Sequence, residues 1–113
     1  GVAAVLNEIA SASHVGVVID EVTVPVAAEV RSACALLGLD PMQVANEGRL
    51  VAWVAGRDGE RAVQVLRACT GGEQAVAIGH VVDEHPGMVV GRTAIGGTRI
   101  IDVPLGELLP RIC

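Results

Sequence analysis

The chain has 113 residues, 51% of them hydrophobic, and a formal net charge of −5. This length allows one domain with a hydrophobic core and is too short for two. The acidic balance and the single aromatic residue argue against nucleic-acid binding, which needs basic and stacking surfaces, and no apolar run approaches the roughly 18 residues of a membrane span. Since no basic segment precedes an apolar one at the start, we expect no signal peptide. The three cysteines have no Cys-x-x-Cys spacing, which argues against a disulfide framework and makes the cytoplasm the expected compartment.

The first part of the chain is predicted to alternate helix and strand. Apolar residues at helical spacing predict a helix over residues 2–12, with Asn7 on its polar side. A short apolar strand is predicted over residues 15–19, and residues 21–24 extend or re-form it after a kink. A second helix is predicted over residues 26–37, because a glycine follows the last apolar position.

Residues 49–55 are apolar on both faces, which predicts a central strand covered on each side. Asp58 is a candidate N-cap for a third helix that carries Cys69 on its apolar face. Three further strands are predicted over residues 76–82, 88–92 and 98–103. The His-Pro-Gly turn at residues 85–87 predicts that the first two form a hairpin. These elements indicate an α+β domain with a mixed or antiparallel sheet covered by helices.

The periodic pattern stops after Val103. Pro104, Gly106 and Pro110 make a long helix improbable in the residues that follow. We therefore expect one domain over residues 1–103 and an extended tail over residues 104–113, either flexible or docked.

Cys113, on this predicted tail, is the first candidate for chemistry. A cysteine thiolate is a nucleophile, and a thiol on such a segment is exposed and can move between sites. Position alone leaves open that Cys113 is a thiol without a role. Cys34 and Cys69 fall on apolar helix faces and are interpreted as small buried hydrophobic residues. Because the cysteines and histidines lack ligand spacing, we expect no metal site.

Glu47 is the second candidate, in an Asn-Glu-Gly stretch just before the predicted strand of residues 49–55. A carboxylate at the mouth of a strand, beside a glycine, suits a general base, and the stretch is equally compatible with a plain turn. Arg92, Arg99 and Arg111 are each able to pair with an anionic group, although solvated charge is the favoured interpretation. The chain contains no lysine, and its eight basic residues are all arginine, which excludes a phosphate-loop lysine within these residues.

Several stretches together resemble the C-terminal domain of the HypE family of hydrogenase maturation factors, in the aminoimidazole ribonucleotide synthetase-like superfamily. The stretches are Leu-Asn-Glu-Ile-Ala (6–10), Leu-Leu-Gly-Leu-Asp-Pro (36–41), Ala-Asn-Glu-Gly-Arg-Leu-Val (45–51), Arg-Thr-Ala-Ile-Gly-Gly-Thr-Arg-Ile-Ile-Asp (92–102) and Leu-Pro-Arg-Ile-Cys (109–113). They follow the family's order along essentially the whole chain, and the last is the most specific.

The resemblance implies an ATP-dependent carbamoyl dehydratase. The carbamoyltransferase HypF loads a carbamoyl group onto the thiol matching Cys113, ATP phosphorylates the thiocarbamate oxygen, and loss of phosphate leaves an S-bound cyanide. That cyanide, a thiocyanate on the thiol, passes to iron on the HypC–HypD scaffold complex. Glu47 matches the acidic residue of the family's corresponding motif and is the expected base.

The resemblance also implies a homodimer and an N-terminal ATP-binding domain that this chain lacks. ATP and Mg are therefore expected in the full-length protein, and none is expected on this domain alone, which should not hydrolyse ATP. Two alternatives remain open. One is a binding or dimerisation module of another synthetase-like nucleotide-biosynthesis enzyme, and the other is a pure interaction domain.

Overall fold

The structure is a computed structural model, and it describes residues 1–103. The predicted tail, with Arg111 and Cys113, lies outside the described residues. The helices are α1 (Val2–Ser13), α2 (Ala28–Leu37), the short 3₁₀ helix η1 (Gly56–Asp58) and α3 (Gly59–Arg67). The strands are β1 (Gly16–Asp20), β2 (Gly79–Val82), β3 (Val89–Arg92) and β4 (Thr98–Ile100). The predicted α+β class is confirmed.

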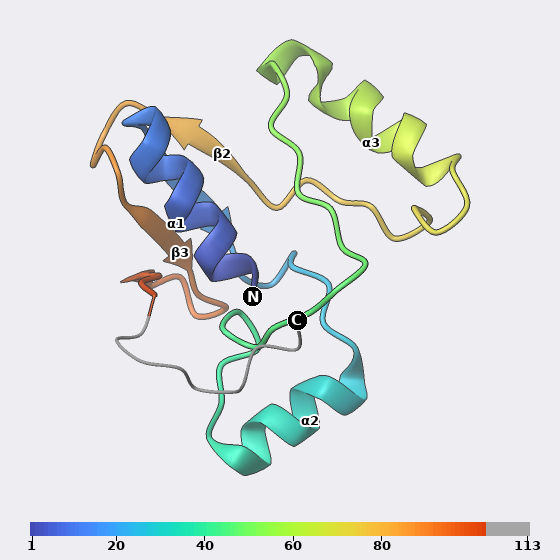
Figure 1. Ribbon diagram of the computed structural model, residues 1–113, viewed down its shortest axis with the longest axis vertical. Helices are drawn as coiled ribbons and strands as arrows, with labels where there is room; N and C mark the ends of the chain where they lie inside the picture. The colour runs from blue at the N-terminus through green and yellow to red at the C-terminus, as the bar shows by residue number, and fades with distance from the viewer. Residues whose placement is uncertain (104–113) are drawn as a thin grey trace.

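The strands form one mixed sheet in the order β2-β1-β3-β4 (Figure 1). β1 runs antiparallel to β2 and parallel to β3, and β3 runs antiparallel to β4. α1 lies across one face of this sheet, while α2 and α3 stand apart from it (Figure 1). The core joins Leu6 of α1 to Ile19, Val89 and Ile101, all of which are almost completely buried.

The predicted hairpin between the strands of residues 76–82 and 88–92 is wrong. β2 and β3 do not pair with each other, because β1 lies between them. The connecting segment passes over the start of β1, where Gly87 N–H donates to the carbonyl of Val15 (2.9 Å) and Val17 N–H donates to that of Met88 (3.0 Å). The His-Pro-Gly turn is present, but it bridges two strands separated by a third.

The central strand predicted over residues 49–55 is also wrong, because these residues form no strand. Val51 and Trp53 pack against the core, whereas Leu50 is 74% exposed and Val54 50% exposed. The central place belongs instead to β1, whose shorter apolar run has a neighbouring strand on each side. Residues 21–24, predicted to extend that strand, form a turn in which Thr23 N–H donates to the carbonyl of Asp20 (3.0 Å).

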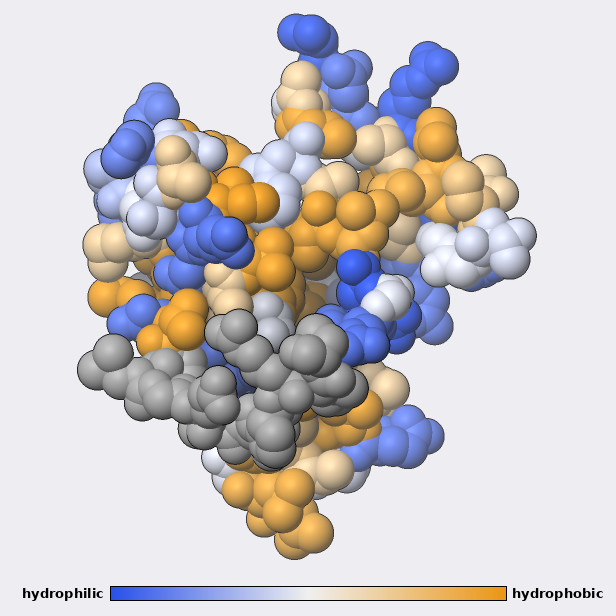
Figure 2. Space-filling view, in the orientation of Figure 1, coloured by the Kyte–Doolittle hydropathy of each residue, from blue (hydrophilic) through white to orange (hydrophobic). Residues whose placement is uncertain are grey.

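α2 keeps much of its apolar surface exposed. Leu36 is 87% exposed and Leu37 68% exposed, and hydrophobic residues gather at the lower end of Figure 2, over the position of α2 in Figure 1. Cys34 is the one buried residue of this helix, at 5% exposure. Among the described residues no helix combines the length and apolar character needed to cross a membrane.

The turn of residues 40–43, which follows α2, ties several elements together. Within the turn, Asp40 accepts a hydrogen bond from Met42 N–H (2.9 Å) through its carboxylate. The Met42 carbonyl accepts from Ala3 N–H of α1 (3.0 Å), and the Met42 side chain is buried in the core. The turn therefore fixes where the chain goes after α2.

Arg99 of β4 links this turn to the end of β1. Its guanidinium donates to both carboxylate oxygens of Glu21 (2.7 and 3.0 Å) and to Asp40 (2.7 Å). The hydrogen bonds to Glu21, and to a smaller extent that to Asp40, hold the pKa of the Arg99 guanidinium above its ordinary value. The favoured interpretation of Arg99 as solvated charge is wrong, because the side chain joins segments that are far apart in the sequence.

We predict that Arg99→Met lowers the free energy of unfolding by roughly 1–2 kcal/mol, measured by urea denaturation with Trp53 fluorescence. The substitution leaves Glu21 and Asp40, whose side chains are 20% and 28% exposed, facing each other without their cation. The matched control is Arg92→Met, since Arg92 is exposed and has no ion pair within residues 1–103. A loss of similar size in the control would show that the network does not stabilise the fold.

The cysteines give a second prediction, because Cys34 and Cys69 differ in burial although the sequence predicts that both are buried. Cys34 is buried as predicted, but Cys69 is exposed, since α3 ends at Arg67, two positions before it, and no residue of α3 is fully buried. In the native chain a thiol-alkylating reagent should modify Cys69 readily and Cys34 only on unfolding, as measured by peptide mass spectrometry over time. Equal labelling rates at the two positions would contradict the placement of α2.

Candidate functional site

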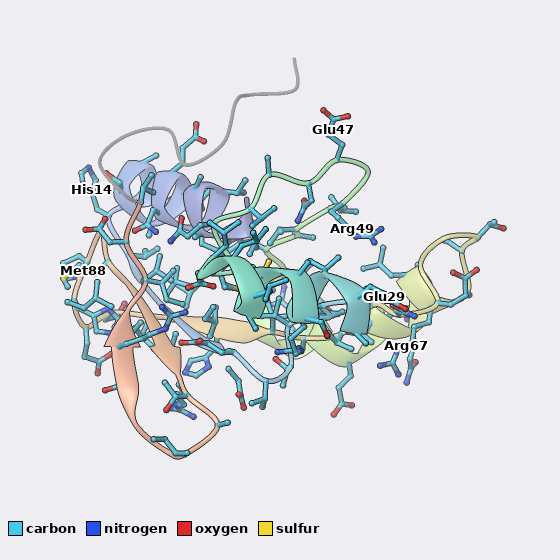
Figure 3. The ribbon with its side chains drawn as sticks, turned by 90° about the horizontal axis from the view of Figure 1, so that it is seen from below. His14, Glu29, Glu47, Arg49, Arg67 and Met88 are labelled. Atoms are coloured by element: carbon cyan, nitrogen blue, oxygen red, sulfur yellow. The ribbon has the colours of Figure 1, made fainter. Side chains whose placement is uncertain are left out.

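Glu47 lies on an open loop and not at the mouth of a strand, because no strand follows it. The residue is exposed, and Figure 3 shows its carboxylate at the tip of the loop, pointing away from the body of the domain. The next residue, Gly48, has a φ of 68°, in the left-handed region that glycine adopts without strain, and no neighbouring atom restricts the space at its Cα. The turn interpretation is correct for the backbone, and the open surroundings leave the carboxylate accessible to another group.

A second feature of the site is the place where the chain leaves the sheet after β4. Ile101 is fully buried, and its N–H donates to the Val89 carbonyl (2.8 Å). The carbonyl of Ile101 accepts from the side-chain amide of Asn7 (2.8 Å), and the next carbonyl, that of Asp102, accepts from the side-chain amide of Gln43 (2.6 Å). These are the last anchored residues before the segment that carries Cys113.

The two features are connected through Gln43. This residue belongs to the turn of residues 40–43, and Glu47 follows it by only four positions. The structure therefore ties the exit of the chain to the turn from which the Glu47 loop begins. Cys113 itself lies outside the described residues.

The other candidate groups do not assemble into a site. Arg92 is exposed on β3, and Arg99 is committed to Glu21 and Asp40. His14 and His80 are exposed, whereas His85 is half-buried. Among residues 1–103 no cluster of His, Cys, Asp or Glu is arranged to hold a metal ion.

Sequence reasoning missed Asn7, Gln43 and the ion pairs of Arg99. Asn7 was assigned to the solvent side of its helix, yet it is half-buried and its amide donates to both Ala3 (2.9 Å) and Ile101 (2.8 Å). Gln43 carries no local signal, because its partner is 59 positions away. The ion pairs of Arg99 carry no local signal either, because Glu21 and Asp40 lie 78 and 59 positions away from it.

Comparison with known proteins identifies relatives of this fold. The chain is 48% identical to the carbamoyl dehydratase HypE of Rhodobacter capsulatus and 50% identical to that of Rhizobium leguminosarum bv. viciae, in both cases over all of its 113 residues. These residues correspond to 33% and 32% of the two relatives. The chain thus spans about a third of the length of the curated relatives it matches.

Solved structures agree with the sequence comparison. A crystal structure of the hydrogenase maturation protein HypE superposes on all of this chain with a TM-score of 0.93 and 43% identity, using 37% of its own length. HypE in complex with ATP matches the whole chain at 0.91 and 42%, with 35% of its length covered. A HypE–HypF complex matches 92% of this chain at 0.86 and 39%, with 33% of its length covered.

The family described as "AIR synthase related protein, C-terminal domain" matches residues 1–91. This match covers most of the described domain, including the Glu47 loop and all strands except β4. The resemblance to the C-terminal domain of HypE, inferred from short stretches, is confirmed over the full length of the chain. The chain belongs to the AIR synthase related protein family, of which it contains the C-terminal domain.

Proposed function

We propose that this chain is the part of a carbamoyl dehydratase that carries the reactive thiol during the maturation of nickel–iron hydrogenases. Relatives that match all of its residues bear that activity as their name. The observation that carries the proposal is the hydrogen bond from Gln43 to the carbonyl of Asp102, because it links the last described residues before the Cys113 segment to the turn that leads into the Glu47 loop.

The lengths involved are compatible with a meeting of the two groups. Cys113 follows Asp102 by eleven positions, and an extended segment of that length reaches about 36 Å. The four positions from Gln43 to Glu47 span at most about 14 Å, to which the Gln43 contact adds one side-chain length. The thiol is therefore able to reach the Glu47 carboxylate and also to turn outward to a partner protein.

The chemistry assigns a separate task to each residue. The thiolate of Cys113 attacks the carbonyl carbon of a carbamoyl donor, so that an S–C bond forms and the donor's leaving group departs. Conversion of this S-carbamoyl group to thiocyanate removes its oxygen and both protons on its nitrogen. Glu47 accepts a proton from that nitrogen, and its exposed loop lets the carboxylate approach a group delivered from outside the domain.

ATP is the proposed co-substrate. Its γ-phosphoryl group transfers to the carbamoyl oxygen with release of ADP, that oxygen then leaves as phosphate, and the second nitrogen proton goes to solvent. The described residues do not fit ATP. Two cavities among residues 1–103 hold about 190 and 260 Å³, below the roughly 300 Å³ at which small-molecule sites begin. The chain also contains no lysine to hold phosphates. One related HypE has been crystallised with ATP, and we place the ATP and Mg contacts in the part of the protein that this chain does not span.

The proposed partners follow from the same chemistry. A carbamoyltransferase has to load the thiol, and a related HypE forms a complex with HypF. An iron scaffold such as HypC–HypD has to receive the cyanide, and a cytoplasmic homodimer is the expected setting. The relatives cited above carry the dehydratase name over the whole chain, which favours this function over the alternative of a module from a nucleotide-biosynthesis enzyme.

The experiment uses full-length protein with its carbamoyltransferase, carbamoyl phosphate and ATP, in a Cys69→Ser background because Cys69 is exposed. Peptide mass spectrometry should find the carbamoyl adduct on Cys113 and none in Cys113→Ala. In Glu47→Gln the adduct should load normally, and its conversion to thiocyanate should slow by roughly 10²–10⁴-fold, as expected for loss of a general base.

The matched control is Glu60→Gln, which makes the same change at an exposed position on α3. It should load and convert like the parent protein. Normal conversion in Glu47→Gln would remove Glu47 from the mechanism, and loading at Cys34 in place of Cys113 would end the carrier assignment.

A further inference from the structure

The hydrogen bonds at the exit of the chain form an unusual anchor. Two consecutive carbonyls, those of Ile101 and Asp102, are held by side-chain amides and not by a neighbouring strand. The amides come from α1 and from the turn of residues 40–43, which are 94 and 59 positions away. Asn7 and Gln43, which lie far apart in the sequence, thus bind two adjacent peptide groups just before Val103.

The Asn7 contact is built into the fold. One amide hydrogen goes to the Ala3 carbonyl of its own helix (2.9 Å) and the other to Ile101 (2.8 Å). Both amide donors are thereby used, which fixes the side chain relative to α1. Because Ile101 is itself fully buried, this half of the anchor does not move without opening the core.

The Gln43 contact has a different character. It is exposed, so its net contribution to stability is small. Its geometric consequence is larger, since Gln43 ties Asp102 to the turn that leads directly into Asn46 and Glu47. A contact that does little for the fold thus sets the position of the chain exit relative to the candidate base.

We propose that Asn7 and Gln43, together the exit clamp, are positioning residues that fix the point and direction from which the Cys113 segment leaves the domain. The inference rests on the proposed function. A tethered group meets its target at an effective concentration set by the tether's origin and span. A separate carbamoyltransferase can load Cys113 even when the start of the segment is poorly fixed. Dehydration at the Glu47 loop, by contrast, requires the start of the segment to have a fixed position and direction.

The test is Gln43→Met in full-length protein, because Met keeps the length and shape of the side chain and removes the donor. Two further variants accompany it. Gln43→Lys restores a donor of similar reach, and Gln64→Met makes the same change at an exposed position on α3. Each variant is measured for hydrogen exchange of a peptide covering Asp102 and Val103, for the rate of Cys113 carbamoylation, and for the rate of dehydration.

The clamp predicts about two- to threefold faster exchange at this peptide in Gln43→Met, and no change in Gln64→Met. Carbamoylation should stay within about twofold of the parent rate, and dehydration should slow by about three- to tenfold. Gln43→Lys should restore both exchange and dehydration. A contact that only stabilised the fold would not slow dehydration while leaving the rate of carbamoylation nearly unchanged.

The outcomes separate the clamp from the function on which it rests. Unchanged exchange in Gln43→Met would show that there is no clamp. Faster exchange with normal dehydration, or an equal loss of loading and dehydration, would overturn the positioning role. If the parent protein itself loads no carbamoyl group on Cys113, the proposed function fails, while the exchange measurement still decides whether the clamp exists.

Discussion

The arrangement depends on one short turn, residues 40–43, between α2 and the Glu47 loop. Asp40 is bound by Arg99 of β4, the Met42 carbonyl by α1, and Gln43 binds the exit of the chain at Asp102. The Met42 side chain enters the core, so the turn cannot shift without disturbing the packing of α1 on the sheet. The loop with the candidate base and the exit toward the candidate thiol are therefore both connected to this one turn.

The predictions that succeeded concern short-range patterns. The helix of residues 2–12 and the strand of residues 15–19 appear within a residue of their expected bounds, because apolar spacing and local breakers determine them. The predictions that failed concern which strands pair. Residues 49–55 have a composition suited to a buried strand, but β1 occupies the centre of the sheet, and strand order depends on long-range packing that a local pattern does not contain.

The same division holds for the candidate site. Cys113 and Glu47 could be selected from the sequence because thiol and carboxylate chemistry is carried by residue type and by the resemblance to HypE. Asn7 and Gln43 could not, since their function depends on partners 94 and 59 positions away. Cys69 shows the converse error, because helical spacing predicted burial, whereas the helix ends at Arg67 and Cys69 is exposed.

We propose that the thiol of Cys113 meets the Glu47 loop, and disulfide trapping tests this contact without relying on catalysis. In full-length protein with Cys69→Ser, Glu47→Cys introduces a thiol at the site of the base, and Glu60→Cys introduces one at an exposed position on α3. A disulfide requires the two Cα atoms to approach within about 7 Å. We expect mild oxidation to join Cys113 to the thiol introduced at position 47 much faster than to that at position 60. Equal rates, or faster bridging at position 60, would show that the thiol does not meet this loop.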